Sequence, residues 1–151
     1  MLKDYYQMVK PGIIRGNLIT VIGAFLFASQ GEVDVLLFIS TVIGIGLVIA
    51  SACVFNNYTD REIDRVMQRT KERALAKSTI KTRDALIFGV LIGLTGLTVL
   101  AGFVNILTAI LGIFAIFAYV VLYGFAKRRT EHGTLVGSIS GALPITAGYV
   151  A

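Results

Sequence analysis

Three things that this sequence lacks narrow its class. It has a single cysteine, Cys53, which excludes a disulfide within the chain. No small-residue cleavage site follows the first apolar run, so we interpret this run as a retained helix and not as a signal peptide. Only 15% of the residues are charged, whereas 56% are hydrophobic and the mean hydropathy is +0.79. A chain of 151 residues with this balance is too apolar for a soluble domain and predicts an integral membrane protein.

The apolar residues are clustered in runs, which predicts an all-α, polytopic helical bundle. We expect about five spans, at residues 13–29, 35–57, 85–104, 106–126 and 135–151. A span needs about 20 residues, and the fifth run is still apolar at Ala151. We therefore expect residues 1–151 to be the N-terminal part of one transmembrane domain whose C-terminal half is missing.

Two of the four connections contain no lysine or arginine, and this asymmetry predicts the orientation. The connection at residues 30–34 is acidic and the turn around Asn105 is uncharged. All 14 basic residues lie in the N-terminal arm (Lys3, Lys10, Arg15), between Arg61 and Arg83 (eight residues), and in Lys127-Arg128-Arg129. The positive-inside rule places these three segments, and with them the N-terminus, on the cytoplasmic side.

A carboxamide and two carboxylates follow one another at steps of four residues where the second span ends. On a helix, Asn56, Asp60 and Asp64 share one face, each a turn after the last. Like charges at this spacing destabilise an isolated helix by roughly 0.2–0.5 kcal/mol, so a compensating charge is expected. Oxygen ligands from Asp and Asn suit a hard divalent cation, and we predict that these three residues bind Mg²⁺ through a substrate phosphate.

A basic ridge runs beside the acidic one. Arg61 and Arg65, followed by Arg69, repeat at the same spacing one position further on. Because bidentate guanidinium groups bind phosphate oxygens, we predict that Arg61 and Arg65 bind a diphosphate. The alternative is a solvated helix of mixed charge without a ligand.

Three ordered blocks of this sequence resemble a known family. Asn56-x-x-x-Asp60-x-x-x-Asp64 is similar to the first aspartate-rich motif of the UbiA superfamily of intramembrane prenyltransferases. The surrounding sequence resembles the haem O synthase branch, the protohaem IX farnesyltransferases, in blocks at residues 10–19, 54–73 and 132–144. The last block reads His132-Gly133-Thr134-Leu135-x-Gly137-Ser138-x-Ser140-Gly141-Ala142-x-Pro144. The resemblance covers essentially the whole chain.

The resemblance implies a bundle of about nine spans with a cavity open to the cytoplasm. It implies farnesyl transfer from farnesyl diphosphate to the vinyl group of haem B, giving haem O, with Mg²⁺ as cofactor. Asn56, Asp60 and Asp64 would form the first catalytic motif, and Tyr123, Lys127 and Arg128 would bind the diphosphate. The implied location is the bacterial cytoplasmic (inner) membrane, with the active site on the cytoplasmic side. Beyond the two substrates we expect the lipid bilayer and haem-handling membrane proteins as partners, and no nucleic acid.

The chain lacks a second aspartate-rich motif, which the family places on another helix. We therefore predict that residues 1–151 alone are inactive. Two other functions are compatible with the residues. The acceptor could be an aromatic quinone precursor, because the acidic motif binds the diphosphate of the donor and does not contact the acceptor. Alternatively, ionisable residues at membrane depth could serve a cation- or proton-coupled membrane carrier.

Overall fold

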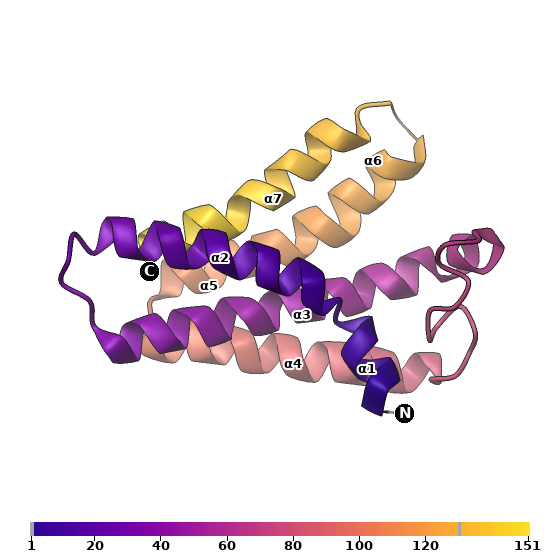
Figure 1. Cartoon of the computed structure of the whole chain (residues 1–151), viewed down its shortest axis with the longest axis horizontal. Coiled ribbons are helices and arrows are strands. Elements are labelled where there is room, and N and C mark those ends of the chain that lie inside the picture. Colours follow the sequence, from indigo (N-terminus) through magenta and orange to yellow (C-terminus); the bar gives the residue numbers. More distant parts are fainter. Residues whose placement is uncertain (1, 130) are drawn as a thin grey trace.

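The computed structural model describes residues 2–129 and 131–151, and all regular elements within them are helical (Figure 1). They are α1 (Leu2–Met8), α2 (Pro11–Ala28), α3 (Val35–Val66), α4 (Thr82–Phe103), α5 (Ile106–Phe117), the π-helical segment η1 (Ala118–Tyr123), α6 (Gly124–Arg129) and α7 (Gly133–Val150). Within these described residues, four stretches are long and apolar enough to cross a membrane, namely Pro11–Ala28, Val35–Val66, Thr82–Phe103 and Ile106–Arg129. The predicted class, an all-α polytopic membrane protein, is confirmed.

Helices α3 and α4 lie side by side along most of their length, and small residues let them approach (Figure 1). A Cβ atom on Gly96 would lie 2.9 Å from the backbone oxygen of Gly44 and 2.9 Å from the Cβ atom of Leu47. Closer to the polar end, the hydroxyl of Ser51 donates a hydrogen bond of 2.8 Å to the backbone oxygen of Gly89. In lipid, where apolar surface gains little from helix association, such close backbone packing and hydrogen bonding hold helices together.

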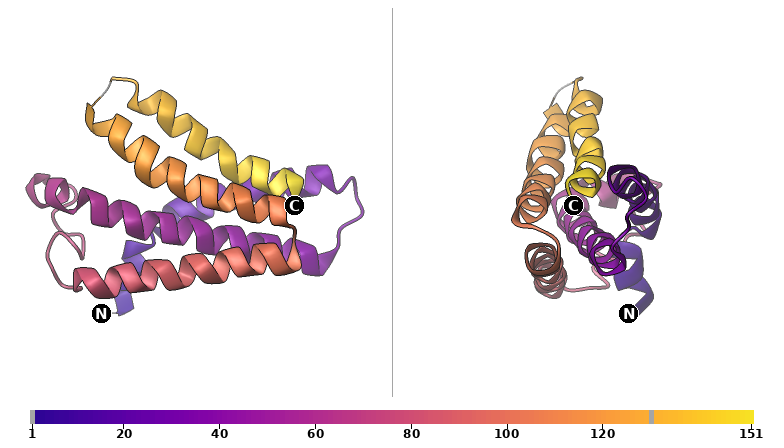
Figure 2. Two further views of the ribbon diagram at one scale, coloured as in Figure 1. Left: turned by 180° about the vertical axis from the view of Figure 1, so that it is seen from behind. Right: turned by 90° about the vertical axis from the view of Figure 1, so that its left-hand side faces the viewer.

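Helix α3 lies at the centre of the bundle, between α2 on one side and α4 and α5 on the other (Figure 2). Helix α7 packs along α2, where a Cβ atom on Gly148 would lie 2.6 Å from the backbone oxygen of Val21. The buried core joins all these helices through Val21, Ile45, Val48, Leu100, Ala109 and Ala147. Because its neighbours surround it, α3 can present polar side chains that are shielded from lipid.

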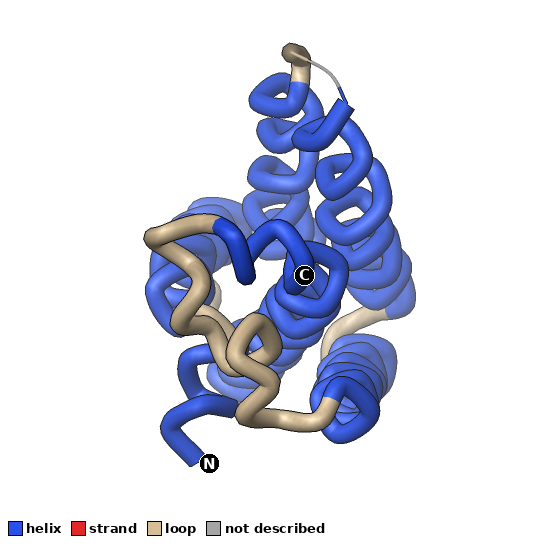
Figure 3. The backbone as a smooth tube through the Cα atoms, turned by 90° about the vertical axis from the view of Figure 1, so that its right-hand side faces the viewer, coloured by secondary structure: helices blue, strands red, loops and turns tan. Residues whose placement is uncertain are grey.

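The polar end of α3 is longer than the predicted span. The span was placed at 35–57, but the helix continues without a break to Val66, and the connection to α4 covers only residues 67–81. This loop folds across the end of the bundle (Figure 3) and inserts Leu75 and Ile80 into a second apolar cluster with Met8 and Val54. The loop and α1 are thereby packed onto α3 beside its acidic face.

The three basic segments gather at one end of the bundle. Side chains from the α1–α2 joint, the 67–81 loop and α6 all reach the same stretch of α3. At the opposite end, Asn105 caps α5 by accepting a 2.8 Å hydrogen bond from the backbone N–H of Thr108, and it donates one of 2.8 Å to the backbone oxygen of Val150. The charge asymmetry of the sequence thus corresponds to the two ends of the structure.

Candidate functional site

The predicted acidic series forms one buried face at the polar end of α3. Asn56 and Asp60 are each 2% exposed and Asp64 is 4% exposed. Three polar groups buried in succession on a helix require partners, because an ionised carboxylate that is removed from water without one is costly. The structure provides a basic partner for each of them.

Asp60 is held by two cations from α6. The Nζ atom of Lys127 lies 2.7 Å from Oδ2 of Asp60, and an Nη atom of Arg128 lies 2.9 Å from Oδ1. The two bases come from 67 and 68 residues further along the chain. The fold therefore brings two of the predicted diphosphate-binding residues directly onto the first carboxylate of the motif.

Asp64 and Asn56 are each held by a base that was not among the predicted site residues. An Nη atom of Arg73, in the 67–81 loop, lies 2.7 Å from Oδ2 of Asp64. The Nζ atom of Lys10 donates a hydrogen bond of 3.0 Å to Oδ1 of Asn56. Burial lowers the pKa of Lys10 below its usual value. Arg73 is the last residue of one block that carries the family resemblance, and Lys10 is the first residue of another. These positions were the sequence signal that could have identified both bases as site residues.

Basic side chains therefore compensate the charges of this face in the structure, and binding of a metal there stays a prediction. This arrangement explains how α3 tolerates two buried carboxylates one turn apart.

Arg61 and Arg65, the other predicted diphosphate-binding residues, are engaged elsewhere. Arg61 donates to the backbone oxygen of Tyr58, 3.0 Å away, lies over the ring of Tyr58, and pairs with Glu62. Arg65 pairs with Glu62 at 2.9 Å and donates to the backbone oxygen of Ala76 at 3.2 Å. The basic ridge therefore ties α3 to its own turn and to the loop, because it points about 100° away from the acidic face.

Tyr123 lies where a π-helical segment interrupts the α5–α6 rod. π-helical turns of this kind are rare and frequent at functional sites. The ring of Tyr123 stacks on Tyr119 with 5.6 Å between ring centroids, and Nζ of Lys127 lies 5.9 Å from the Tyr123 centroid. Gly137 of α7 makes room for this ring, since a Cβ atom there would lie 3.0 Å from the Cε2 atom of Tyr123. Tyr123 therefore flanks the base that holds Asp60.

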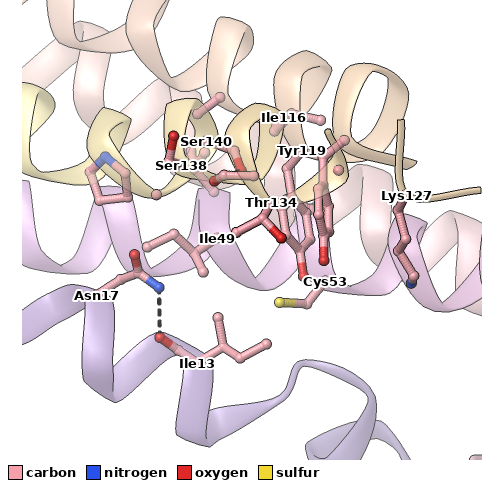
Figure 4. Close-up of a pocket in the computed structure, with 18 of the residues that line it drawn as sticks. Ile13, Asn17, Ile49, Cys53, Ile116, Tyr119, Lys127, Thr134, Ser138 and Ser140 are labelled. Atoms are coloured by element: carbon pink, nitrogen blue, oxygen red, sulfur yellow. Dashed lines mark hydrogen bonds between the residues drawn. The ribbon is translucent and has the colours of Figure 1, made fainter. Parts of the chain in front are cut away.

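A cavity of about 700 Å³ lies between α2, α3, the α5–α6 rod and α7. Figure 4 shows apolar side chains such as Ile49 and Ile116 facing it together with Tyr119 and the hydroxyl groups of α7. Lys127 lines the cavity and also binds Asp60, so it connects this space with the acidic face. An apolar chamber that ends at a cluster of charged groups is suited to a ligand with one apolar and one anionic part.

The oxygen donors of the acidic face can be compared with what a divalent metal requires. Within residues 2–129 and 131–151, no group of three His, Cys, Asp or Glu side chains comes together as a complete metal cage. Two carboxylates remain, and a carboxylate offers about four lone-pair sites. Asp60 uses two of these for its basic partners and Asp64 uses one for Arg73. The residues fit a metal such as Mg²⁺, which binds through one or two carboxylates, water and a substrate phosphate.

Comparison with known proteins gave consistent matches. The model of one protein family, described as the UbiA prenyltransferase family, matches residues 17–151. A protohaem IX farnesyltransferase of Photorhabdus laumondii is 51% identical over 152 aligned residues, which include all of this chain and 52% of that protein. The corresponding protein of Yersinia pseudotuberculosis is 49% identical over 52% of its length, and that of Shigella flexneri is 50% identical over 51%. The chain spans about half the length of these relatives. No solved structure matches it.

Proposed function

The chain belongs to the UbiA prenyltransferase family, and from this premise we propose that it takes part in farnesyl transfer from farnesyl diphosphate to a vinyl group of haem B, the reaction that makes haem O. The observation that carries the proposal is identity of about 50% along the whole chain to proteins named for this activity. The buried acidic face, with bases on each of its members, supplies the chemistry that release of a diphosphate requires.

We assign Asp60 and Asp64 to the divalent metal that UbiA prenyltransferases use for diphosphate binding. Mg²⁺ fits this donor set best, because both side chains offer only oxygen ligands. When bound, the metal would neutralise charge that develops on the departing diphosphate. Asn56 belongs to the same motif and lies one turn before Asp60 on the same face of α3.

The bases have a second task in this proposal. Lys127, Arg128 and Arg73 neutralise the carboxylates when no diphosphate is present. On binding, their N–H groups turn toward phosphate oxygens, where they stabilise the leaving group. Arg61 and Arg65 add positive charge at the same end of the bundle and attract the anionic substrate.

The cavity and Tyr123 serve the apolar partner of the reaction. The cavity volume of about 700 Å³ lies within the range typical of small-molecule and cofactor sites. Apolar walls exclude water, which would otherwise capture an allylic cation. The phenol of Tyr123 lies beside Lys127 and borders the point where the prenyl chain and the diphosphate would separate.

The proposed location is the bacterial inner membrane with the site on the cytoplasmic side. The support is the concentration of the basic segments at the end of the bundle that carries the acidic face, together with the acidic connection near Glu32 and Asp34 at the other end. Prenyl diphosphates and haem B would then enter from the cytoplasmic leaflet.

The test is farnesyl transfer to haem B in membranes that carry the full open reading frame encoding this chain. We expect haem O with Mg²⁺ from the wild type and none from an Asp60→Ala variant of equal abundance. The 151-residue chain alone should be inactive, because it contributes only one pair of metal-binding carboxylates. Transfer to an aromatic quinone precursor but not to haem would replace the acceptor. No prenyl transfer to either acceptor would contradict the enzyme and favour a carrier.

A further inference from the structure

The lining of the cavity of about 700 Å³ changes from charged to apolar along the α5–α6 rod. At the charged end, Lys127 binds Asp60, and the ring of Tyr123 lies beside Lys127. Tyr119 lies one turn further from this end, in η1, and stacks on Tyr123. Tyr119 also lines the cavity. It therefore lies between the charged end of the cavity and the apolar walls.

The side chain of Tyr119 faces α3 across the cavity. In Figure 4 its phenol and the hydroxyl of Thr134 point toward the sulfur of Cys53. Cys53 precedes Asp60 by seven residues, which is about 10 Å along a helix. A diphosphate held through a metal at Asp60 and Asp64 would fill part of this length. The first carbons of a prenyl chain that enters the cavity would then reach the level of Tyr119.

The lining at this level offers no carboxylate to balance a positive charge. Among the described residues that line the cavity, Glu131 has the one carboxylate, and it lies in the connection between α6 and α7. The walls near Tyr119 are formed by apolar side chains such as Ile49 and Ile116 and by short hydroxyl side chains of α7. A cation in such a space lacks solvation by water. The face of an aromatic ring attracts a cation, and more strongly when water is excluded.

Two aromatic rings line the cavity within the described residues, and they differ in their partners. The ring of Tyr123 already has a cation beside it, since Nζ of Lys127 lies 5.9 Å from its centroid. Within residues 2–129 and 131–151, no basic side chain lies over the ring of Tyr119. This ring is therefore available to a cation that belongs to a ligand.

We propose that Tyr119 is a further catalytic residue, whose ring stabilises the positive charge that develops on the allylic carbons of farnesyl diphosphate. In this step the bond between C1 and the diphosphate oxygen breaks, and its electron pair leaves with the diphosphate. The charge that remains is shared by C1 and C3 and passes to the acceptor when C1 bonds to it. This inference rests on the proposed function and deepens it.

The experiment follows farnesyl transfer by the full-length protein while the ring at position 119 is made progressively less electron-rich. Tyr119→Phe keeps the ring and should retain most of kcat. Phenylalanine with one, two or three ring fluorines is then incorporated at this position, because fluorine withdraws electron density from the ring face with little change of shape. We expect kcat to fall with each fluorine while the KM for farnesyl diphosphate stays constant, since the ring acts on charge formed in the transition state.

Tyr119→Leu removes the ring altogether. It should lower kcat by about 10- to 30-fold, as expected for the loss of a cation–π contact from which water is excluded. Tyr149→Leu is the matched control and should leave kcat unchanged, because Tyr149 lies near the other end of α7 and is not among the described residues that line this cavity. If Tyr119→Leu folds poorly, the fluorinated series still tests the proposal, because those variants keep the ring.

Three results would overturn the inference. A kcat that does not depend on fluorination would show that the ring face does not act on the charge. A raised KM with an unchanged kcat in Tyr119→Leu would make Tyr119 a packing partner of Tyr123. A wild type that transfers farnesyl to no acceptor would refute the proposed function together with this inference. Transfer to an aromatic quinone precursor alone, with the same dependence on fluorination, would refute the acceptor and support the role of Tyr119.

Discussion

Replacement of Gly96 by alanine should force α3 and α4 apart. The new Cβ atom would meet the backbone oxygen of Gly44 and the Cβ atom of Leu47, each at 2.9 Å, and the backbone nitrogen of Val48 at 3.1 Å. Because two of these atoms belong to the backbone of α3, no side chain can rotate to relieve the contact. Overpacking of this kind costs about 1–3 kcal/mol. The consequence extends to the site, because α4 supports the helix that carries Asp60.

Gly102→Ala provides the matched control. It lies in the same helix, and a Cβ atom there would meet nothing within 4 Å. Both variants gain the helix propensity of alanine over glycine, so the difference between them isolates the packing cost. At about 2–4 °C per kcal/mol, Gly96→Ala should unfold about 2–12 °C below Gly102→Ala in thermal melts of the full-length protein in detergent. Equal melting temperatures would refute the close approach of α3 and α4 at Gly96.

Three further predictions concern the site. Asp60→Asn should lower farnesyl transfer by about 10²–10³-fold, as expected for loss of charge at a metal site. The control Asp34→Asn preserves the N-cap of α3 at the other end and should retain activity in the same assay. Equal rates for the two variants would exclude Asp60 from catalysis. Removal of divalent ions with EDTA should abolish transfer and Mg²⁺ should restore it, while a potassium salt of equal ionic strength should not; activity that survives EDTA would contradict the metal assignment. Gly137→Ala should displace the ring of Tyr123 and raise the KM for farnesyl diphosphate. Gly124→Ala has open space for a Cβ atom and should leave this KM unchanged. An unchanged KM for both variants would remove Tyr123 from the diphosphate site.

The sequence alone was sufficient to predict the membrane class, the helical composition and the approximate helix positions. Runs of apolar residues have few alternatives to helices in a bilayer, since every backbone polar group must be satisfied within the segment. The acidic series was also predictable, because Asn56, Asp60 and Asp64 lie within one helix and the helical repeat fixes their relation. The extent of α3 was less clear, since polarity marks the end of a span and not the end of a helix.

The partners of the acidic face could not be predicted in this way. Arg61 and Arg65 were assigned to the diphosphate because their four-residue spacing places a basic ridge beside the acidic series. In the structure they contact their own turn and the loop, and their binding to a diphosphate stays a prediction. Lys10, Arg73 and Lys127 reach the series from segments 46, 9 and 67 residues away. Their positions depend on how α1, the 67–81 loop and the α5–α6 rod pack against α3. The sequence determined a row of polar groups along a helix, and only the tertiary structure determined which charges neutralise it, because those contacts join elements that no local repeat relates.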